Sequence, residues 1–354
     1  MKAGISKDSR ILITGSSGVL GSNVTNYLSE LGFENLILLD IAPPKDGSSS
    51  KYRFITADIT KDDLPFQLFQ DVDVIVHCAS AAPSYSTQLI YSIIVEGTKN
   101  LLNHAHEANV SRFIYISSTA VYGIPKSVPL HEDSERQNYH DPYNRAKIQA
   151  EDVCEDFRNK GMCLTILRPR TFLGPGRMGT FAMLNEWASE GRNFPLLGAG
   201  KNRYQFLDVE DLCQAIYLCI VKPAELTNDN FNIGAKRFSS IREDYQSVLE
   251  SAGYGKRIIL LPAKPALLML NLLEKVNLIP LYKRLYEKIV MDYYVSIDKA
   301  ERILGYEPKY SNRDTLVRCY EWYISNKSSF DNKTGTANNA PWKQGVIGLV
   351  KPFF

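Results

Sequence analysis

The sequence has few residues of the kind that bind metals, and its cysteines lack the spacing of a metal site or a disulfide framework. The 354 residues include five histidines and six cysteines, and no two cysteines form a CxxC pair. His104 and His106, two positions apart, would point to different faces of a helix. We therefore predict no metal site, and the scattered cysteines are typical of a reduced, cytoplasmic protein.

The sequence also lacks an excess of charge, a basic block and a long apolar segment. Lysine and arginine total 41 residues against 39 acidic residues, a net charge of +2, which argues against a nucleic-acid partner. The N-terminal residues MKAGISKDSR contain no apolar run, so we expect no secretory signal. Residues 265–273 (PALLMLNLL) are too few to cross a bilayer, which takes about 18 apolar residues.

A glycine-rich stretch, residues 11–21 (ILITGSSGVLG), is the strongest pattern in the chain. An apolar run leads into it, and an apolar periodicity typical of a helix follows it. Gly15 permits a sharp exit from a strand, Gly18 lets backbone N–H groups approach a pyrophosphate, and Gly21 lets the helix pack closely. This context favours a dinucleotide site over a structural turn. The predicted contacts are Gly15, Ser17, Gly18, Val19, Leu20 and Gly21.

An acidic residue ends the next predicted strand, where residues 36–39 (LILL) lead to Asp40. A carboxylate there accepts hydrogen bonds from the adenosine ribose hydroxyls and repels a 2′-phosphate. Because no arginine lies beside Asp40, we predict NAD rather than NADP as the cofactor. A third strand, residues 52–56, leads to Asp58 and Ile59, which we place in the same cofactor pocket. Asp58 either contacts the adenine amino group or caps a helix, and both interpretations stay open.

Small residues follow the apolar strand predicted for residues 72–77 (VDVIVH). Small side chains at the carboxyl end of a central strand leave room for a ligand across the sheet. We therefore predict that Cys78, Ala79 and Ser80 contact the cofactor and that Ala82 contacts the substrate. The alternative is that these residues only allow a helix to pack closely.

A tyrosine and a lysine, Tyr143 and Lys147, share one face of a predicted helix because they stand at i and i+4. An ammonium close to a phenol favours the phenolate, drawing the tyrosine pKa down from about 10. Such a tyrosine can exchange a proton with an alcohol or ketone while a nicotinamide exchanges a hydride. Ser118 follows the strand predicted for residues 113–116, after a long helix over residues 87–108, and we expect it to join them.

With these motifs the chain resembles the extended short-chain dehydrogenase/reductases, the NAD-dependent epimerase/dehydratase family, over about residues 11–323. The segments LRP (167–169), GPG (174–176), RYQFLDVEDL (203–212) and LGYEP (304–308) also resemble that family. The resemblance implies that Ser118, Tyr143 and Lys147 are catalytic, with Tyr143 and Lys147 also contacting NAD. It further implies a cofactor contact by Arg168. The implied substrate contacts are Ala82, Ser118, Thr119, Thr171, Arg177 and Arg203.

The predicted architecture is α/β, a doubly wound parallel sheet with a smaller C-terminal substrate lobe. Residues 1–173 form the NAD-binding domain, to which residues 206–220 and about 231–233 return by family resemblance. Residues 174–324 are mainly the substrate lobe, and 325–354 form a polar linker and an apolar tail. We expect the tail to dock on its own domain or a partner subunit, with weak membrane-surface contact as the alternative. The helices over 87–108 and 143–159 are the expected homodimer interface.

The substrate is less well defined, because the chain departs from sugar-nucleotide members of the family. Ile94 and Thr171 stand where those members have asparagine, and residues 260–290 replace an RxGD segment with an apolar stretch. We predict an epimerase or dehydratase acting on an activated sugar, either nucleotide- or lipid-linked. The alternatives are a 3β-hydroxysteroid-type NAD-dependent dehydrogenase and a non-catalytic NAD-binding protein.

Overall fold

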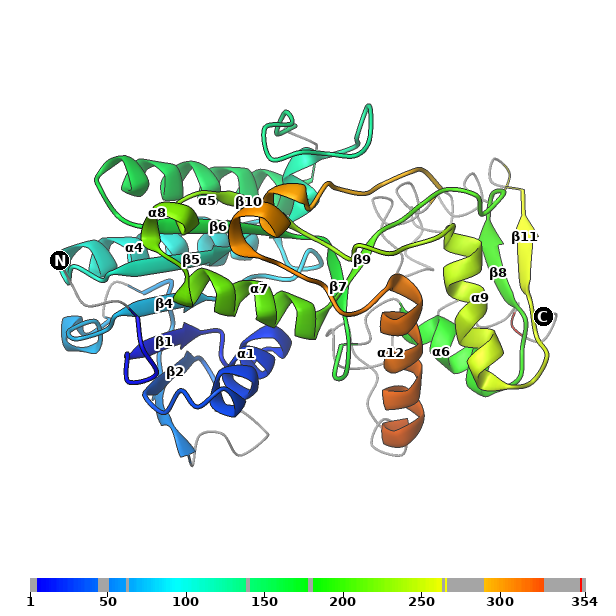
Figure 1. The fold of residues 1–354 in the computed structure, drawn as a ribbon, viewed down its shortest axis with the longest axis horizontal. Helices are drawn as coiled ribbons and strands as arrows, with labels where there is room; N and C mark the ends of the chain where they lie inside the picture. The colour runs from blue at the N-terminus through cyan, green and yellow to red at the C-terminus, as the bar shows by residue number, and fades with distance from the viewer. Residues whose placement is uncertain are drawn as a thin grey trace.

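The computed structural model describes residues 5–43, 51–61, 64–137, 141–177, 181–262, 265, 290–327 and 351. Its main element is a seven-stranded sheet in the order β10-β6-β5-β4-β1-β2-β3, with every neighbouring pair parallel (Figure 1). The strands are β1 (Ile11–Thr14), β2 (Leu36–Asp40), β3 (Arg53–Thr56), β4 (Val74–His77), β5 (Arg112–Ile116), β6 (Leu164–Pro169) and β10 (Asn230–Ile233). The predicted α/β fold with a doubly wound parallel sheet is confirmed. The strand order reverses between β1 and β4, the place where such sheets bind ligands.

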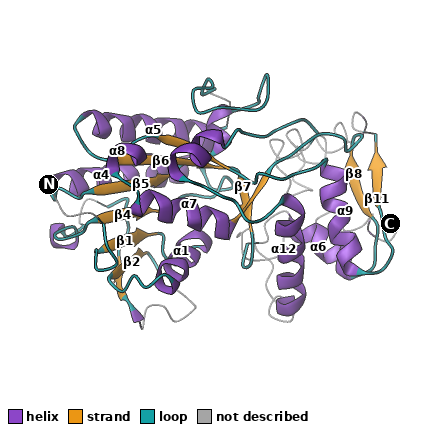
Figure 2. Ribbon diagram, viewed as in Figure 1, coloured by secondary structure: helices purple, strands orange, loops and turns teal. Residues whose placement is uncertain are grey.

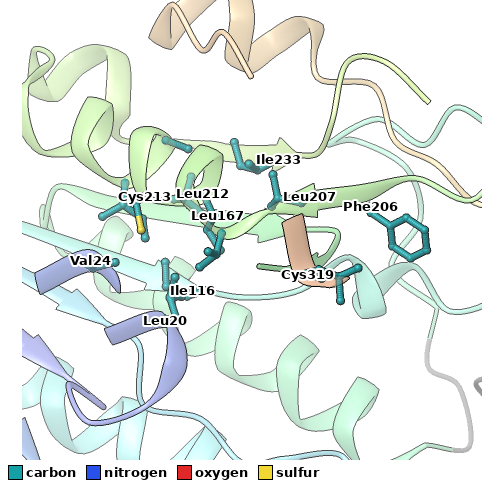
Figure 3. Close-up of a cluster of buried hydrophobic side chains, with 14 of the residues drawn as sticks. Leu20, Val24, Ile116, Leu167, Phe206, Leu207, Leu212, Cys213, Ile233 and Cys319 are labelled. Carbon is teal, nitrogen blue, oxygen red and sulfur yellow. The ribbon is translucent and has the colours of Figure 1, made fainter. Parts of the chain in front are cut away.

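Successive residues of the central strands enter two separate cores, because side chains alternate across a strand. Ile11 and Ile13 of β1 face a core shared with the helices α1 (Val19–Glu30) and α7 (Val209–Val221), whereas Leu12 faces the other side. The second core includes residues of the helices α4 (Gly97–Glu107) and α5 (Pro142–Asn159). Figure 3 shows part of the first core, where Leu20 and Leu212 approach from different helices. Burial on both faces explains why these strands are apolar throughout.

The helix predicted over residues 87–108 is not one regular helix. It consists of α3 (Thr87–Tyr91), the π-helical turn η2 (Ser92–Glu96) and α4. A π-turn inserts an extra residue into the helical repeat. Ile94, in the π-turn, is 1% exposed and belongs to the second core. The apolar spacing therefore located the helical segment correctly but did not indicate its interruption.

Three helices and two small sheets form a second region beside the main sheet (Figures 1 and 2). Its helices α6 (Ala182–Ser189), α9 (Ile241–Ala252) and α12 (Asn312–Asn326) pack on one another. Two small parallel sheets accompany them, β7 (Thr171–Leu173) with β9 (Phe206–Asp208), and β8 (Phe194–Leu197) with β11 (Ile258–Leu261). Short helical elements complete the described chain: η1 (Phe66–Leu68), η3 (Thr119–Tyr122), α8 (Ala224–Thr227) and η5 (Ala300–Leu304).

The segment predicted to return to the main sheet, residues 206–220, does so only in part. Its helix α7 covers the main sheet, but its strand β9 pairs with β7 in a separate sheet. The edge position beside β6 is taken by β10, so β9 has no place in the main sheet.

Most of the apolar segment 260–290 and of the tail 341–354 lies outside the described residues. Lys351, within the tail, lies against α6, where its ammonium contacts Glu186 and, at 2.6 Å, Glu190. Arg192 donates a hydrogen bond of 3.0 Å to the Lys351 carbonyl oxygen. Within the described ranges, no helix has the length and apolar character needed to cross a membrane. All six cysteines are described and unpaired.

Candidate active site

The turn between β1 and α1 is built for close approach of a ligand to the backbone. Gly15 has a φ of +66°, and a Cβ there would lie 2.5 Å from the backbone nitrogen of Ala79, so only glycine fits. Gly18 is the N-cap of α1, and within the described chain it has no side-chain cap, nor has the first turn an acidic residue. The N–H groups at this helix start therefore face the turn without a side-chain acceptor, an arrangement suited to an anion.

Asp40 lies beside this turn, at the end of β2. Its carboxylate accepts hydrogen bonds from the backbone N–H of Ser17 at 2.9 Å and of Ile41 at 2.7 Å. The carboxylate thus holds the glycine turn while its side chain stays half-buried. The residues after β4 lie next to the same turn, because Cys78 donates a backbone hydrogen bond of 3.1 Å to Thr14. Ala79 and Cys78 are half-buried, and Ser80 is exposed.

Asp58 makes only local contacts among those described. Its Oδ1 accepts hydrogen bonds from the backbone N–H of Thr60 at 2.9 Å and from the Thr60 hydroxyl at 2.8 Å. These bonds favour the turn-forming interpretation of Asp58, and its contact with adenine stays a prediction. Ile59 is 5% exposed and packs against Gly97 of α4, which has no room for a larger residue.

The helix α5 begins at the predicted tyrosine–lysine motif. Asp141 caps it by accepting a hydrogen bond of 3.0 Å from the Tyr143 N–H, and Pro142 occupies the first helical position. Lys147, one turn later, is 1% exposed and donates hydrogen bonds to the Ile116 carbonyl at 2.8 Å and the Tyr115 hydroxyl at 3.3 Å. Its nitrogen lies 5.9 Å from the centre of the Tyr143 ring. The lysine thus lies between the tyrosine and the carboxyl end of β5.

Ser118 follows β5 directly and caps η3. Its hydroxyl oxygen accepts a hydrogen bond of 3.1 Å from the Ala120 N–H, which leaves the hydroxyl hydrogen able to donate. Asn144 of α5 donates a 2.6 Å hydrogen bond to the Ala120 carbonyl, so α5 and η3 are tied together. The order of β5, η3 and α5 therefore brings Ser118, Tyr143 and Lys147 to one end of the sheet.

Burial governs the charge of Lys147. Its burial lowers the pKa of the ammonium to about 8, and the nearby carboxylate of Glu151 offsets part of this shift. Glu151, one further turn along α5, is completely buried. It was not singled out from the sequence, although its i+4 spacing from Lys147 places it on the same helical face.

Arg168, which the resemblance implies is a cofactor contact, is buried among protein hydrogen-bond acceptors. Its guanidinium donates to Glu151 at 2.9 and 2.7 Å, to the Tyr122 hydroxyl at 2.9 Å and to the Glu132 carbonyl at 2.8 Å. The side chain is 2% exposed. The guanidinium thus serves as the counter-charge of Glu151, and the cofactor contact implied by the family resemblance stays a prediction.

The predicted substrate residues lie in different surroundings. The guanidinium carbon of Arg177 stacks 3.7 Å from the centre of the Phe172 ring. Burial lowers the pKa of Arg177 to about 10, and electrostatic interactions with Tyr143 and Cys319 oppose this shift. Arg203 is half exposed, with its guanidinium 4.5 Å from the centre of the Tyr294 ring.

The two threonines are engaged within the protein. Thr171 has its hydroxyl 3.4 Å from that of Tyr204. Thr119 is 3% exposed, and its hydroxyl accepts from Arg170 at 3.3 Å. Arg170, also missed from the sequence, is itself buried between the rings of Tyr204 and Tyr293. The substrate contact of Thr119 stays a prediction, as does that of half-buried Ala82.

One family model and several curated proteins match this chain in sequence. A model of the NAD dependent epimerase/dehydratase family matches residues 11–234. The uncharacterized protein y4nG of Sinorhizobium fredii is 33% identical over 344 residues, which cover 96% of this chain and 85% of that protein. The 3 beta-hydroxysteroid dehydrogenase/Delta 5-->4-isomerase of Mycobacterium tuberculosis is 26% identical, with coverages of 89% and 90%.

Solved structures have the same fold. The UDP-glucose 4-epimerase of Thermotoga maritima aligns with a TM-score of 0.74 at 23% identity, covering 90% of this chain and 99% of that one. The dTDP-glucose 4,6-dehydratase DesIV of Streptomyces venezuelae, solved with NAD and TYD bound, aligns with a TM-score of 0.72 at 24% identity, covering 91% and 99%. With the family model matching more than half of its length, the chain belongs to the NAD-dependent epimerase/dehydratase family of extended short-chain dehydrogenase/reductases.

Proposed function

We propose that this chain is an NAD-dependent enzyme that oxidises a hydroxyl group of an activated sugar and then returns the hydride, as an epimerase or dehydratase. The observation that carries the proposal is the buried Lys147 between Tyr143 and the carboxyl end of β5. Burying an ammonium costs folding free energy unless hydrogen bonds and an opposite charge compensate it, and Lys147 has two hydrogen bonds and the nearby Glu151 carboxylate. Its position beside a tyrosine is the one that proton transfer requires.

The residues around the glycine turn fit NAD. The uncapped N-terminus of α1 suits the pyrophosphate, and Gly15 brings the backbone close without a side chain in the way. The Asp40 carboxylate, at the end of the neighbouring strand, suits the two ribose hydroxyls and opposes a 2′-phosphate. When bound, NAD supplies a hydride acceptor at the nicotinamide.

Each catalytic side chain then has a distinct task. Tyr143 takes the proton from the substrate hydroxyl and gives it back when the carbonyl is reduced. Lys147, held by Ile116 and Tyr115, stabilises the tyrosine in its charged form and holds the nicotinamide ribose. The Ser118 hydroxyl donates to the substrate oxygen. Arg177 supplies positive charge near Tyr143 and suits an anionic substrate such as a sugar nucleotide or a lipid-linked sugar phosphate.

A 3β-hydroxysteroid-type dehydrogenase is the second candidate. Ile94 is buried in the second core and offers no polar contact where sugar-nucleotide members have asparagine. The relative from Mycobacterium tuberculosis, whose name assigns it hydroxysteroid dehydrogenation, covers nearly the whole chain.

The cofactor balance separates the two reactions. We would incubate the purified protein with UDP-glucose, dTDP-glucose or dehydroepiandrosterone, each with NAD⁺ far below the substrate concentration. An epimerase or dehydratase completes many turnovers per NAD⁺, because it regenerates its cofactor. A dehydrogenase stops when the NAD⁺ is consumed and releases an equal amount of NADH. If the protein binds no NAD⁺ at all, both proposals fail. If it binds NAD⁺ but converts no related substrate, it is a non-catalytic NAD-binding protein.

A further inference from the structure

Five buried polar side chains form a chain beneath the carboxyl edge of the sheet. They are Thr14 of β1, His77 of β4, Thr98 of α4, Tyr115 of β5 and Lys147 of α5, and none is more than 1% exposed. Thr14 Oγ1 lies 2.7 Å from His77 Nδ1, and His77 Nε2 lies 3.0 Å from Thr98 Oγ1. Tyr115 accepts a hydrogen bond of 3.3 Å from Lys147, and a side-chain interaction with Thr98 opposes the rise in the pKa of Tyr115 that burial causes. The chain thus joins the residue before Gly15 to the catalytic lysine.

The direction of each hydrogen bond follows from the acceptors present. The Thr98 hydroxyl donates to the Ile94 carbonyl at 2.6 Å, so its oxygen accepts from its other partners. His77 therefore carries its proton on Nε2 and accepts from Thr14 at Nδ1. Burial and the positive charge of Lys147 lower the pKa of His77 to about 3, which keeps the ring neutral. The Tyr115 hydroxyl oxygen accepts from the Lys147 ammonium at 3.3 Å.

This arrangement determines where the Lys147 ammonium points. Two of its three N–H groups are directed at the Ile116 carbonyl and the Tyr115 hydroxyl. Since an ammonium is tetrahedral, two fixed bonds leave the third N–H one direction. A phenylalanine at position 115 would fill the same space but leave the Ile116 carbonyl as the one acceptor that these two bonds provide, so the nitrogen would be held less firmly. A buried polar chain of this kind costs stability unless every member is satisfied, so its presence needs a reason.

We infer that Tyr115 is a positioning residue, held by Thr98 and His77, that aims the Lys147 ammonium at the bound cofactor. The inference rests on the proposed function, because it requires Lys147 to contact NAD. Tyr115 itself lies behind Lys147, touches neither cofactor nor substrate, and acts through the lysine. The same series of polar side chains ends at Thr14, the last residue of β1. It therefore contacts both the strand before the glycine turn and Lys147.

The first test is the affinity for NAD⁺, measured by calorimetry on the intact protein. Tyr115→Phe removes one hydroxyl and should weaken NAD⁺ binding about three- to tenfold, the worth of one hydrogen bond. Tyr306→Phe is the matched control, because Tyr306 is also buried and donates to the Gly234 carbonyl at 3.2 Å on another element. It should leave the affinity unchanged. Equal affinities for wild type and Tyr115→Phe would overturn the inference while leaving the proposed function intact.

A double-mutant cycle tests whether Tyr115 acts through Lys147. In a Lys147→Met background, Tyr115→Phe should cause no further loss of NAD⁺ affinity, whereas a general structural role predicts the same loss in both backgrounds. Thr98→Val provides an independent check because it frees the Tyr115 hydroxyl. It should weaken binding less than Tyr115→Phe and add nothing to it in the double variant. Additive losses of NAD⁺ affinity in either cycle would contradict the inference. A wild-type protein that binds no NAD⁺ would contradict both the inference and the proposed function.

Discussion

Replacing Glu151 by glutamine tests the buried charges behind the active site. Glu151 is completely buried and accepts hydrogen bonds from the Arg168 guanidinium at 2.9 and 2.7 Å and from the Ser117 hydroxyl at 2.5 Å. Glu151→Gln keeps the shape but leaves Arg168 as a buried charge with one weakened partner. Removing one member of a buried ion pair costs about 3–5 kcal/mol. Because glutamine retains an oxygen acceptor, we expect a loss near the lower limit, about 3 kcal/mol.

The matched control is an arginine–glutamate pair on the surface. Glu250 lies 3.3 Å from Arg313, and both side chains are more than half exposed. Solvent screens such a pair, so Glu250→Gln should change the free energy of unfolding by less than about 1 kcal/mol. Urea denaturation followed by tryptophan fluorescence at pH 7 gives both values. If Glu151→Gln costs no more than Glu250→Gln, the buried pair does not hold this part of the fold, and the reasoning is refuted.

The same substitution has a functional consequence with a defined sign. The Glu151 carboxylate opposes the burial that lowers the pKa of Lys147 to about 8. Without that carboxylate the pKa of Lys147 falls further, so the ammonium is lost at a lower pH. The alkaline limit of NAD⁺ affinity in Glu151→Gln should therefore move to lower pH than in wild type, as calorimetric titrations across pH 6–9 would reveal.

Three further predictions concern the cofactor turn, the lobe and the assembly. Gly15→Ala should abolish measurable NAD⁺ binding, since its Cβ would collide with the Ala79 backbone, whereas Gly161→Ala, also at positive φ but in open space, should only lower stability. Burial raises the pKa of Asp244 from 3.8 to about 6. Its favourable contribution to stability is therefore complete below pH 3.8 and is lost as the pH rises through 6. In Asp244→Asn the urea midpoint should depend less on pH between pH 4 and 6. We also expect a homodimer through α3, α4 and α5, and light scattering that gives a monomer mass at micromolar concentration would contradict it.

Much of the fold and of the cofactor site follows from local patterns. The glycine turn carries its own strand and helix, and the alternation of β1 between two cores is implied by its continuous apolar run. Tyr143 and Lys147 are predictable because a helix fixes their spacing. These features depend on contacts between near neighbours in sequence, which is why periodicity and turn chemistry suffice to locate them.

The features that sequence reasoning missed depend on contacts between distant segments. The partner of Arg168 became clear only when β6 and α5 were placed side by side, because the family resemblance implied a cofactor contact and said nothing of Glu151. The pairing of β9 with β7 depends on β10 already occupying the sheet edge. His77 and Tyr115 have the pattern of ordinary strand residues, and these two hydrogen bonds come from two helices, α4 and α5, packed on the sheet.

The most direct test of the proposed chemistry is the turnover of Tyr143→Phe beside that of wild type, on whichever candidate substrate wild type converts. The substitution removes one hydroxyl at the helix start, so the fold and the affinity for NAD⁺ should be retained, which calorimetry checks. If Tyr143 transfers the proton, turnover should fall by about 10²–10⁴-fold. A Tyr143→Phe protein that binds NAD⁺ and turns over at nearly the wild-type rate would contradict the catalytic assignment and the proposed reaction with it.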